Sequence, residues 1–227
     1  DWLKAYLQSI RTYQSLMPGR EVVSIYFGGG TPSLMAPNEV RAIIDEVTGG
    51  WGVSDQVEIT LEANPTSTEM NKFEAFRQAG VNRLSLGVQS LRDEALSFLG
   101  RLHSSDDVRR ALGIASKVFD RFTFDLIYAR PGQTLTGWKQ ELQEAIPLMK
   151  GHLSAYQLTI KPGTAFARQV DRGDLKLADD DCLADFYTMT SDVMTDHGMP
   201  PYEVSNYGAA GQESRHNMVY WLYQDYV

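Results

Sequence analysis

The chain has 227 residues, of which 43% are hydrophobic and 22% are charged, and it carries a formal net charge of -8. This length and composition predict a soluble protein with one sizeable core, organised as one α/β domain rather than two. The acidic balance excludes a general nucleic-acid binder, which would carry a basic face. No apolar run of about 18 residues predicts a membrane span, and no signal peptide is visible, so we expect a cytoplasmic protein.

The chain carries one cysteine, Cys182. A single cysteine excludes an internal disulfide, and also a metal or cluster site built from several thiolates within this chain. Cys182 follows three aspartates, residues 179–181, at a predicted helix start, and we interpret it as structural. Residues 2–7 begin inside an amphipathic pattern, and the chain stops just after an aromatic-rich stretch, so we expect a fragment.

Helical and strand periodicities alternate along the chain. In the first half, the pattern predicts a helix over 2–16, a strand over 21–27, a helix over 37–47, a strand over 56–63, a helix over 67–79 and a strand over 82–88. In the second half, it predicts helices over 92–99 and 105–118, a strand over 122–128, a helix over 135–149, a strand over 153–160, a polar segment over 162–176, a helix over 179–197 and a short strand over 202–205. This alternation favours a parallel sheet flanked by helices.

The strand over 21–27 leads directly into three glycines, Gly28, Gly29 and Gly30, followed by Thr31 and Pro32. Consecutive glycines cost backbone entropy, so a chain keeps them where the backbone takes positive φ or approaches another group closely. Pro32 fixes its own φ and pushes Thr31 toward the extended region, which defines the shape of the loop. The segment indicates a ligand-binding loop, and an ordinary strand-to-helix turn is the alternative.

Polar side chains occur in or at the ends of the later predicted strands: Glu62, Gln89, Asp125 and Thr159. In a β/α barrel the carboxyl ends of the strands build the active site, so these residues and the glycine loop should converge on one mouth. Buried carboxylates need partners, and Arg83, Arg101 or polar groups of a ligand are the candidates. The alternative is that Glu62 and Asp125 only tie down loops.

Several segments together carry a family resemblance: Gly28-Gly29-Gly30-Thr31-Pro32-Ser33, Glu62-Ala63-Asn64-Pro65, residues 80–90 (GVNRLSLGVQS), Leu99-Gly100-Arg101 and Asp125-Leu126-Ile127-Tyr128. In order and spacing they resemble the radical S-adenosylmethionine (SAM) proteins of the HemN group, the coproporphyrinogen dehydrogenases. The resemblance covers nearly the whole chain. It implies a partial (β/α)6 barrel, truncated at both ends, with residues 1–205 as the barrel core lacking its first strand and 206–227 as the start of a post-barrel region.

The resemblance also implies the site. SAM would bind across the strand ends, at positions that match contact residues of the family: Gly29, Gly30, Thr31, Glu62, Gln89, Arg101, Asp125 and Thr159. Gly29, Gly30 and Thr31 would line the methionine end, and Glu62 would face its amino group. The family's 4Fe-4S cluster is held by a C-x-x-x-C-x-x-C motif, which would lie upstream of Asp1. This chain alone is therefore not expected to be catalytically active.

Residues 202–207 (YEVSNY) and 216–221 (HNMVYW) resemble the HemW branch of this group, the haem chaperones. The hexapeptide is associated with haem there, and imidazole is a usual axial ligand of haem iron, so His216 is the candidate haem ligand. A surface loop with a hydrogen-bonded histidine is the alternative. His103 is assigned to the cofactor loop, whereas His152 and His197 are interpreted as caps or surface residues.

Two functions follow from the resemblance. One is a chaperone that binds haem or a porphyrin together with SAM and delivers haem to an acceptor protein. The other is an oxygen-independent coproporphyrinogen III oxidase-like enzyme of porphyrin biosynthesis. A β/α domain that has lost its cluster and both roles is a third possibility, which the joint presence of the glycine loop, Glu62 and Gln89 disfavours.

Overall fold

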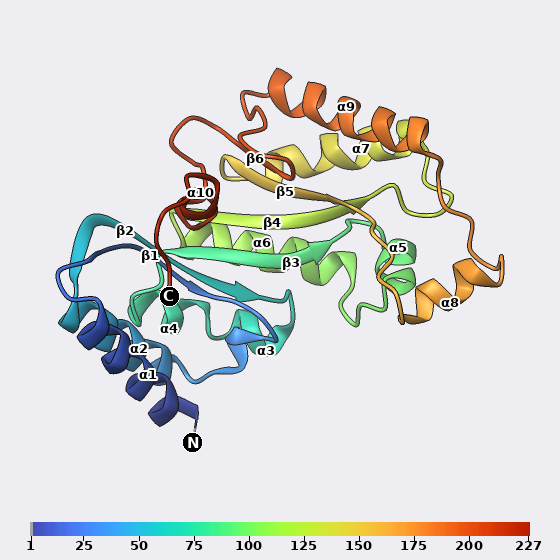
Figure 1. Cartoon of the computed structure of the whole chain (residues 1–227). Helices are drawn as coiled ribbons and strands as arrows, with labels where there is room; N and C mark the ends of the chain where they lie inside the picture. The colour runs from blue at the N-terminus through green and yellow to red at the C-terminus, as the bar shows by residue number, and fades with distance from the viewer. Residues whose placement is uncertain (1) are drawn as a thin grey trace. The chain divides into compact units, whose positions relative to one another are not determined.

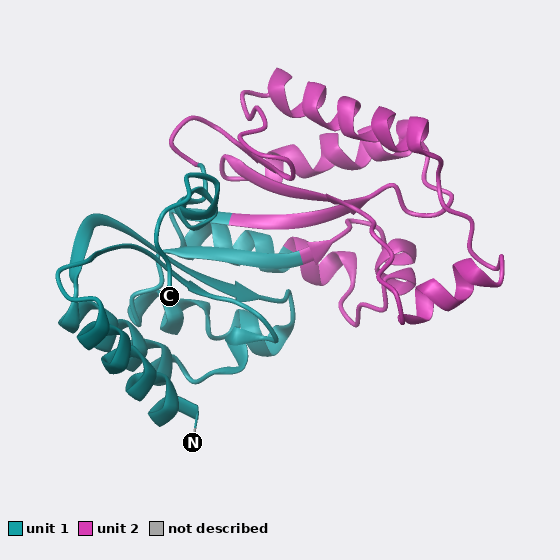
Figure 2. Cartoon of the chain, in the orientation of Figure 1, with its two compact units in different colours: residues 1–87, 110–122, 213–227 teal, residues 88–109, 123–212 magenta. Residues whose placement is uncertain are grey.

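The structure, a computed structural model, describes residues 2–227, which form two compact units (Figure 2). Unit 1 holds the chain up to Gly87 together with 110–122 and 213–227, and unit 2 holds 88–109 and 123–212. The strands follow the order β1-β2-β3-β4-β5-β6 (Figure 1). The chain therefore has the predicted α/β fold.

Unit 1 contains most of the first half of the chain. Its elements are α1 (Trp2–Leu16), β1 (Glu21–Phe27), η1 (Pro32–Leu34), α2 (Pro37–Gly50), β2 (Gly52–Ala63), α3 (Ser67–Met70), α4 (Phe73–Gln78), most of β3 (Arg83–Gln89), most of α6 (Ser105–Val118) and α10 (Arg215–Trp221). Strands β1, β2 and β3 pair in parallel. The predicted bounds of α1, β1 and α6 are confirmed.

Unit 2 contains the later strands and the helices that follow them. Its elements are α5 (Asp93–Phe98), most of β4 (Arg121–Tyr128), α7 (Leu135–Ala145), η2 (Ile146–Leu148), β5 (His152–Gln157), α8 (Ala165–Asp171), α9 (Asp180–Asp196) and β6 (Asn206–Gly208). Strands β4 and β5 are parallel, whereas β6 runs antiparallel to β5. The predicted parallel sheet is therefore confirmed for these pairs, and its last strand, β6, is an antiparallel addition.

The predicted strand over 202–205 is also wrong. The backbone N–H of Tyr202 donates to the carbonyl of Asn206 at 3.1 Å, and the Glu203 carboxylate accepts the backbone N–H of Ser205 at 3.1 Å. These bonds close residues 202–205 into a turn, because a side-chain acceptor offers the backbone an alternative to a ladder. The strand begins only at Asn206, after the chain has reversed.

Three other predicted elements end or break where local bonds compete. The helix expected over 67–79 divides into α3 and α4, because the Lys72 N–H bonds the Glu69 carbonyl three residues back at 2.9 Å. Pro147 lacks an N–H, so α7 ends in a 3₁₀ turn. Strand β5 ends at Gln157, three residues before the predicted end. Helices α8 and α10 were not predicted, although Thr164 and Ser214 cap them.

The core of unit 1 lies between the strands and the helices α2 and α4. Val40, Ile44, Phe73 and Phe76 are buried there, and Phe73 meets Phe119 edge to face with ring centroids 6.3 Å apart. Helix α2 supplies its buried residues at helical spacing, and Pro37 stands at its first turn where no N–H bond is lost. The apolar face of these helices thus holds the three parallel strands in place.

The core of unit 2 is built around aromatic side chains. Tyr128 at the end of β4 stacks on Trp138 of α7 with centroids 5.5 Å apart, and on Phe186 of α9 at 6.2 Å. The indole N–H of Trp138 donates to the Thr190 hydroxyl at 2.8 Å, which satisfies the buried donor. Helices α7 and α9 are thereby fixed against each other and against β4.

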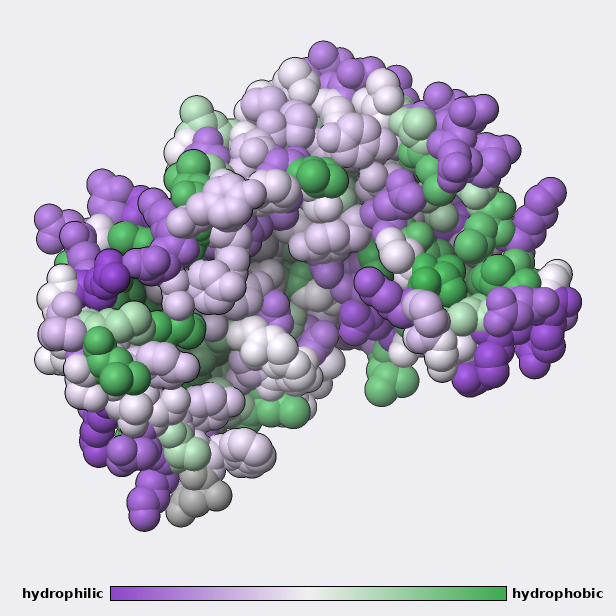
Figure 3. Space-filling model, in the orientation of Figure 1, coloured by the Kyte–Doolittle hydropathy of each residue, from purple (hydrophilic) through white to green (hydrophobic). Residues whose placement is uncertain are grey.

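On the visible face, hydrophobic residues are interspersed with hydrophilic ones (Figure 3). Helix α1 buries none of its residues and exposes Trp2 and Leu16. Helix α10 and the residues after it expose Trp221, Leu222 and Tyr223. Among residues 2–227, no helix has both the length and the apolar character needed to cross a membrane.

Candidate functional site

The glycine loop after β1 has the backbone conformation that its glycines allow. Gly29 and Gly30 have φ of 76° and 52°, and a Cβ built on either would meet no atom within 4 Å. These two glycines are therefore required by backbone conformation and leave open space beside the loop. Thr31, which precedes Pro32, has φ of -144° and ψ of 85°, close to but outside the predicted extended region, and is half-buried.

Gly28 is different, because its environment is crowded. A Cβ there would lie 2.6 Å from Cε1 of Tyr26 and 3.3 Å from Oε1 of Glu62. Gly28 is thus needed because a side chain approaches its backbone closely. That side chain, Tyr26, belongs to the strand that carries the loop.

Glu62 holds the loop from the neighbouring strand. The β1–β2 register sets Phe27 opposite Leu61, so Glu62 lies level with the start of the glycine loop. Its Oε1 accepts the Tyr26 hydroxyl at 2.7 Å, and its Oε2 accepts the Gly29 N–H at 3.1 Å. Burial, and then the Glu62 carboxylate, raise the pKa of Tyr26, so this hydroxyl remains a donor.

His216 lies on the other side of the Tyr26 ring. The two rings stack with centroids 4.3 Å apart and 19° between their planes, and Tyr220 meets the imidazole edge to face at 5.1 Å. Burial lowers the pKa of His216, which favours the neutral imidazole. Within residues 2–227, neither ring nitrogen of His216 makes a hydrogen bond to another residue.

The backbone around His216 is fixed by Glu58, a buried residue of β2 that is 1% exposed. Oε1 of Glu58 accepts the His216 N–H at 3.2 Å and the Ser214 hydroxyl at 3.4 Å. Its Oε2 lies 3.0 Å from Arg121 and 3.7 Å from Arg83. We expected Arg83 to partner Glu62 or Asp125, but it lies beside Glu58, which the sequence did not single out.

The other three histidines all use a ring nitrogen within the protein. Nε2 of His103 is 3.3 Å from the Val88 carbonyl, and Nδ1 of His197 is 2.7 Å from the Val193 carbonyl at the end of α9. His152 is 2% exposed and bridges Thr123 and Tyr202 at 2.7 Å and 2.8 Å. Interpreting His152 as a cap or surface residue is therefore wrong, because its neighbour strands bury it.

In unit 2, Gln89 and Asp125 form one compact arrangement. Gln89 ends β3 with φ of 74°, a left-handed conformation that is costly for a residue with a side chain. Oδ1 of Asp125 accepts the N–H groups of Val88 and Gln89 at 2.7 Å and 3.2 Å, and Oδ2 accepts the Gln89 side-chain amide at 2.7 Å. These bonds hold the strained strand end.

The environment of Asp125 also changes its acidity. Burial raises the pKa of Asp125 to about 6 from 3.8, although the Gln89 and Val88 bonds and the nearby Arg101 oppose the shift. Arg101 is half-buried and lies within electrostatic reach of this carboxylate. The structure therefore groups Gln89, Arg101 and Asp125.

Thr159 departs from its expected place. Strand β5 ends at Gln157, so Thr159 does not end the strand, and it is exposed. Its hydroxyl donates to the Gln157 carbonyl at 3.3 Å. The Leu158 N–H donates to the Tyr128 carbonyl at 2.9 Å, which is the last ladder bond of the Tyr128–Gln157 pair, and the strand pairing ends there.

The predicted residues thus fall into two groups. Gly29, Gly30, Thr31, Glu62 and His216 belong to unit 1, and the remaining four belong to unit 2: Gln89, Arg101, Asp125 and Thr159. Tyr26 joins the first group and was missed by the sequence reasoning. Tyr26 could have been found from the alternation of side chains along its strand, which can place a tyrosine on the same face of the sheet as a carboxylate of the neighbouring strand. Convergence of both groups on one mouth stays a prediction.

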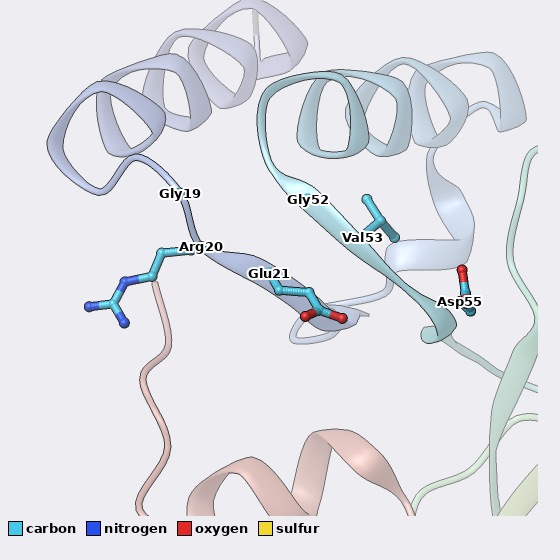
Figure 4. Close-up of a pocket in the computed structure, with 6 residues that line it drawn as sticks. All are labelled: Gly19, Arg20, Glu21, Gly52, Val53 and Asp55. Carbon is cyan, nitrogen blue, oxygen red and sulfur yellow. The ribbon is translucent and has the colours of Figure 1, made fainter.

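One hollow in unit 1 lies away from these residues. It is lined by Gly19, Arg20, Glu21, Gly52, Val53 and Asp55 (Figure 4). These residues stand at or near the starts of β1 and β2, whereas the glycine loop and Glu62 stand at their ends. The hollow therefore does not belong to the predicted site.

Side chains that could bind a metal ion do not gather at one place among residues 2–227. In the part that the structure describes, no three His, Cys, Asp or Glu side chains gather in a way that could hold a metal ion. Cys182 is free, and its N–H donates to the Asp179 carboxylate at 2.9 Å at the start of α9. This bond caps the helix through the backbone and does not involve the Cys182 thiol, so the structural interpretation of Cys182 stays a prediction.

Comparisons with known proteins agree with the motifs. The chain is 42% identical over 218 residues to the mitochondrial radical S-adenosyl methionine domain-containing protein 1 of Mus musculus, covering 96% of this chain and 49% of that protein. It is 38% identical over 228 residues to the heme chaperone HemW of Escherichia coli strain K12, covering 100% of this chain and 59% of that protein. The chain thus spans about half the length of the curated relatives it matches.

A solved structure matches the fold. The coproporphyrinogen III oxidase HemN of Escherichia coli aligns with a TM-score of 0.77 at 24% identity, over 96% of this chain and 50% of that one. The family model of the radical SAM superfamily matches residues 9–145, more than half of the chain. The chain belongs to the radical SAM superfamily, and this membership implies the use of SAM and a 4Fe-4S cluster.

Proposed function

We propose that the protein containing this chain is a haem chaperone that binds haem through His216 and SAM through the glycine loop, and delivers haem to an acceptor protein. The observation that carries the proposal is the imidazole of His216. Among the four histidines it alone, within the described residues, leaves both ring nitrogens without a protein partner. Its stacking on Tyr26 holds the ring in one orientation, and the lowered pKa favours the neutral form that binds iron.

The similarity to relatives named heme chaperones supports the same proposal. HemW of Escherichia coli matches over the whole of this chain, including the segment of α10 that carries His216. Haem delivery itself would be a property of the full-length protein. The iron ligand can be tested first, because His216 and the residues that contact it lie within this chain.

For SAM, the residues around the loop fit the methionine end of the ligand. Glu62 offers a carboxylate to an ammonium group, and the open space beside Gly29 and Gly30 lets the ligand approach the backbone. Thr31 continues the loop. We also propose Gln89, Arg101, Asp125 and Thr159 as SAM contacts in unit 2. Bound SAM would supply the sulfonium bond on which the superfamily's chemistry depends.

The described residues do not fit an iron–sulfur cluster. They offer one cysteine and no group of ligands for a metal ion. The proposed haem and SAM contacts do not depend on the cluster. The porphyrinogen oxidase alternative stays a prediction for the full-length protein, because the likeness to HemN at 24% identity bears on the fold alone.

A haemin titration tests the proposal. His216→Ala should weaken haemin binding by about tenfold or more, the factor that corresponds to 1.4 kcal/mol, and should abolish the wild-type shift of the Soret band. His197→Ala is the matched control, because that imidazole is exposed and caps α9, and it should leave both readouts unchanged. An unchanged Soret shift and affinity in His216→Ala would refute the assignment.

A further inference from the structure

Tyr26 connects the glycine loop to the imidazole on α10. Its hydroxyl donates to Glu62 at 2.7 Å, and the same carboxylate accepts the Gly29 N–H at 3.1 Å. Its ring stacks on His216 at 4.3 Å. The residues form a continuous series of contacts from Gly29 through Glu62 and Tyr26 to His216, all within unit 1.

The ring of Tyr26 has little freedom to move. Its edge lies so close to Gly28 that even a Cβ there would approach Cε1 to 2.6 Å. Its hydroxyl is tied to Glu62, and one face is covered by His216. A displacement of Glu62 must therefore be taken up by the phenol, either by loss of its hydrogen bond or by a shift of the ring.

The imidazole, in contrast, is held from two independent sides. Glu58 binds the backbone N–H of His216 and is itself fixed by Arg83 and Arg121. The side chain is oriented by Tyr26 and by the edge contact with Tyr220. The backbone contact is made by Glu58, whereas the ring is contacted by Tyr26, which is bonded to Glu62, so a change at the loop would reach the imidazole through Tyr26.

We propose that Tyr26 is a positioning residue that couples ligand binding at the glycine loop to the orientation of the His216 imidazole. An ammonium-bearing ligand such as SAM competes for Glu62, whose two oxygens are already used by Tyr26 and Gly29. Binding therefore changes the hydrogen bond of the phenol and the stack behind it. The identity of the two ligands rests on the proposed function, whereas the coupling rests on this geometry.

Coupling of this kind is reciprocal, so SAM should change haemin affinity by the same factor by which haemin changes SAM affinity. In the protein at its natural length, we expect saturating SAM to change the haemin dissociation constant by about fivefold or more, the lower end of typical coupling. Tyr26→Phe keeps the ring and removes the hydroxyl. It should keep haemin affinity without SAM within about twofold, and reduce the SAM effect to less than about twofold.

Two further variants separate coupling from a structural role. Tyr26→Leu removes the ring as well as the hydroxyl, and should weaken haemin binding even without SAM because the stack is lost. Tyr220→Phe makes the same chemical change as Tyr26→Phe on the other tyrosine that contacts His216. It should keep the wild-type SAM effect, since Glu62 retains its phenol.

The histidine ring signals in NMR give a readout that needs no haem. The His216 signal, assigned by its loss in His216→Ala, should shift when SAM is added to the wild type and to Tyr220→Phe, and stay in place in Tyr26→Phe. If haemin binds His216→Ala as tightly as it binds the wild type, His216 is not the haem ligand. The shift of the His216 signal on addition of SAM still tests the coupling in that case. No response to SAM in the wild type, or an equal response in Tyr26→Phe, overturns the coupling.

Discussion

Glu62 and Asp125 are both carboxylates near the ends of parallel strands, but the two units use them differently. Asp125 accepts three hydrogen bonds from the end of β3, and both of its oxygens are occupied by Val88 and Gln89. Glu62 accepts one hydroxyl and one backbone N–H, next to a loop with open space beside two glycines. Asp125 therefore holds a strand end through three protein donors, whereas Glu62 holds the loop through two and stands beside open space.

The largest effect should come from removing the more fully bonded carboxylate. Asp125→Ala leaves three donors without their acceptor at a strained strand end, so we expect a loss of about 3 to 4 kcal/mol in the free energy of unfolding. Urea unfolding measures it. Asp120→Ala is the control. The Asp120 side chain is 91% exposed and forms a surface ion pair with Arg77 at 3.7 Å, so its removal should change the free energy of unfolding little. Equal losses in both variants would contradict this structural role.

The acidity of Asp125 predicts a pH dependence. Because its pKa is raised to about 6 from 3.8, the folded state holds a proton in this range that the unfolded state has released. The stabilising contribution is therefore complete below pH 3.8 and is lost as the pH rises through about 6. We expect the stability of the wild type relative to Asp125→Asn to fall by about 2 to 3 kcal/mol across this window. A difference independent of pH would show that Asp125 titrates normally.

Substitutions of Gly28 and Gly29 test the contacts around Glu62. Gly28→Ala should push the Tyr26 ring away from Glu62, at a cost of about 2 kcal/mol in stability, and should move the His216 ring signal in NMR. Gly29→Ala meets no atom within 4 Å and costs only the conformational strain of positive φ, about 1 to 2 kcal/mol. Its effect on the His216 signal should be smaller than that of Gly28→Ala, and an equal shift would contradict the contact between Gly28 and Tyr26.

The smallest expected effect concerns ligand affinity. Glu62→Gln keeps an acceptor for Tyr26 but removes the charge that would face an ammonium group. We expect SAM to bind about tenfold more weakly, corresponding to 1.4 kcal/mol, with little change in stability. Equilibrium dialysis with labelled SAM measures it. If Glu62→Gln binds SAM as the wild type does, the Glu62 carboxylate serves the loop alone.

Local periodicity predicted the order and type of most elements. The bounds of α1, β1 and α6 were correct, because apolar spacing and terminating residues are local properties. Errors occurred where turn-forming bonds replaced the local preference, as at residues 202–205. Helix α10 was missed because it is short, although Ser214 provides its cap.

The sequence by itself determined the α/β class, the glycine loop and the carboxylates near strand ends, since residue type and spacing carry that information. The tertiary structure alone decided what each carboxylate bonds. Strand register brought Tyr26 and Glu62 together, and the return of the chain after β6 set His216 against Tyr26. Tyr26 and His216 are 190 residues apart in the sequence. A contact between residues at such a separation follows from tertiary packing rather than from a local sequence pattern.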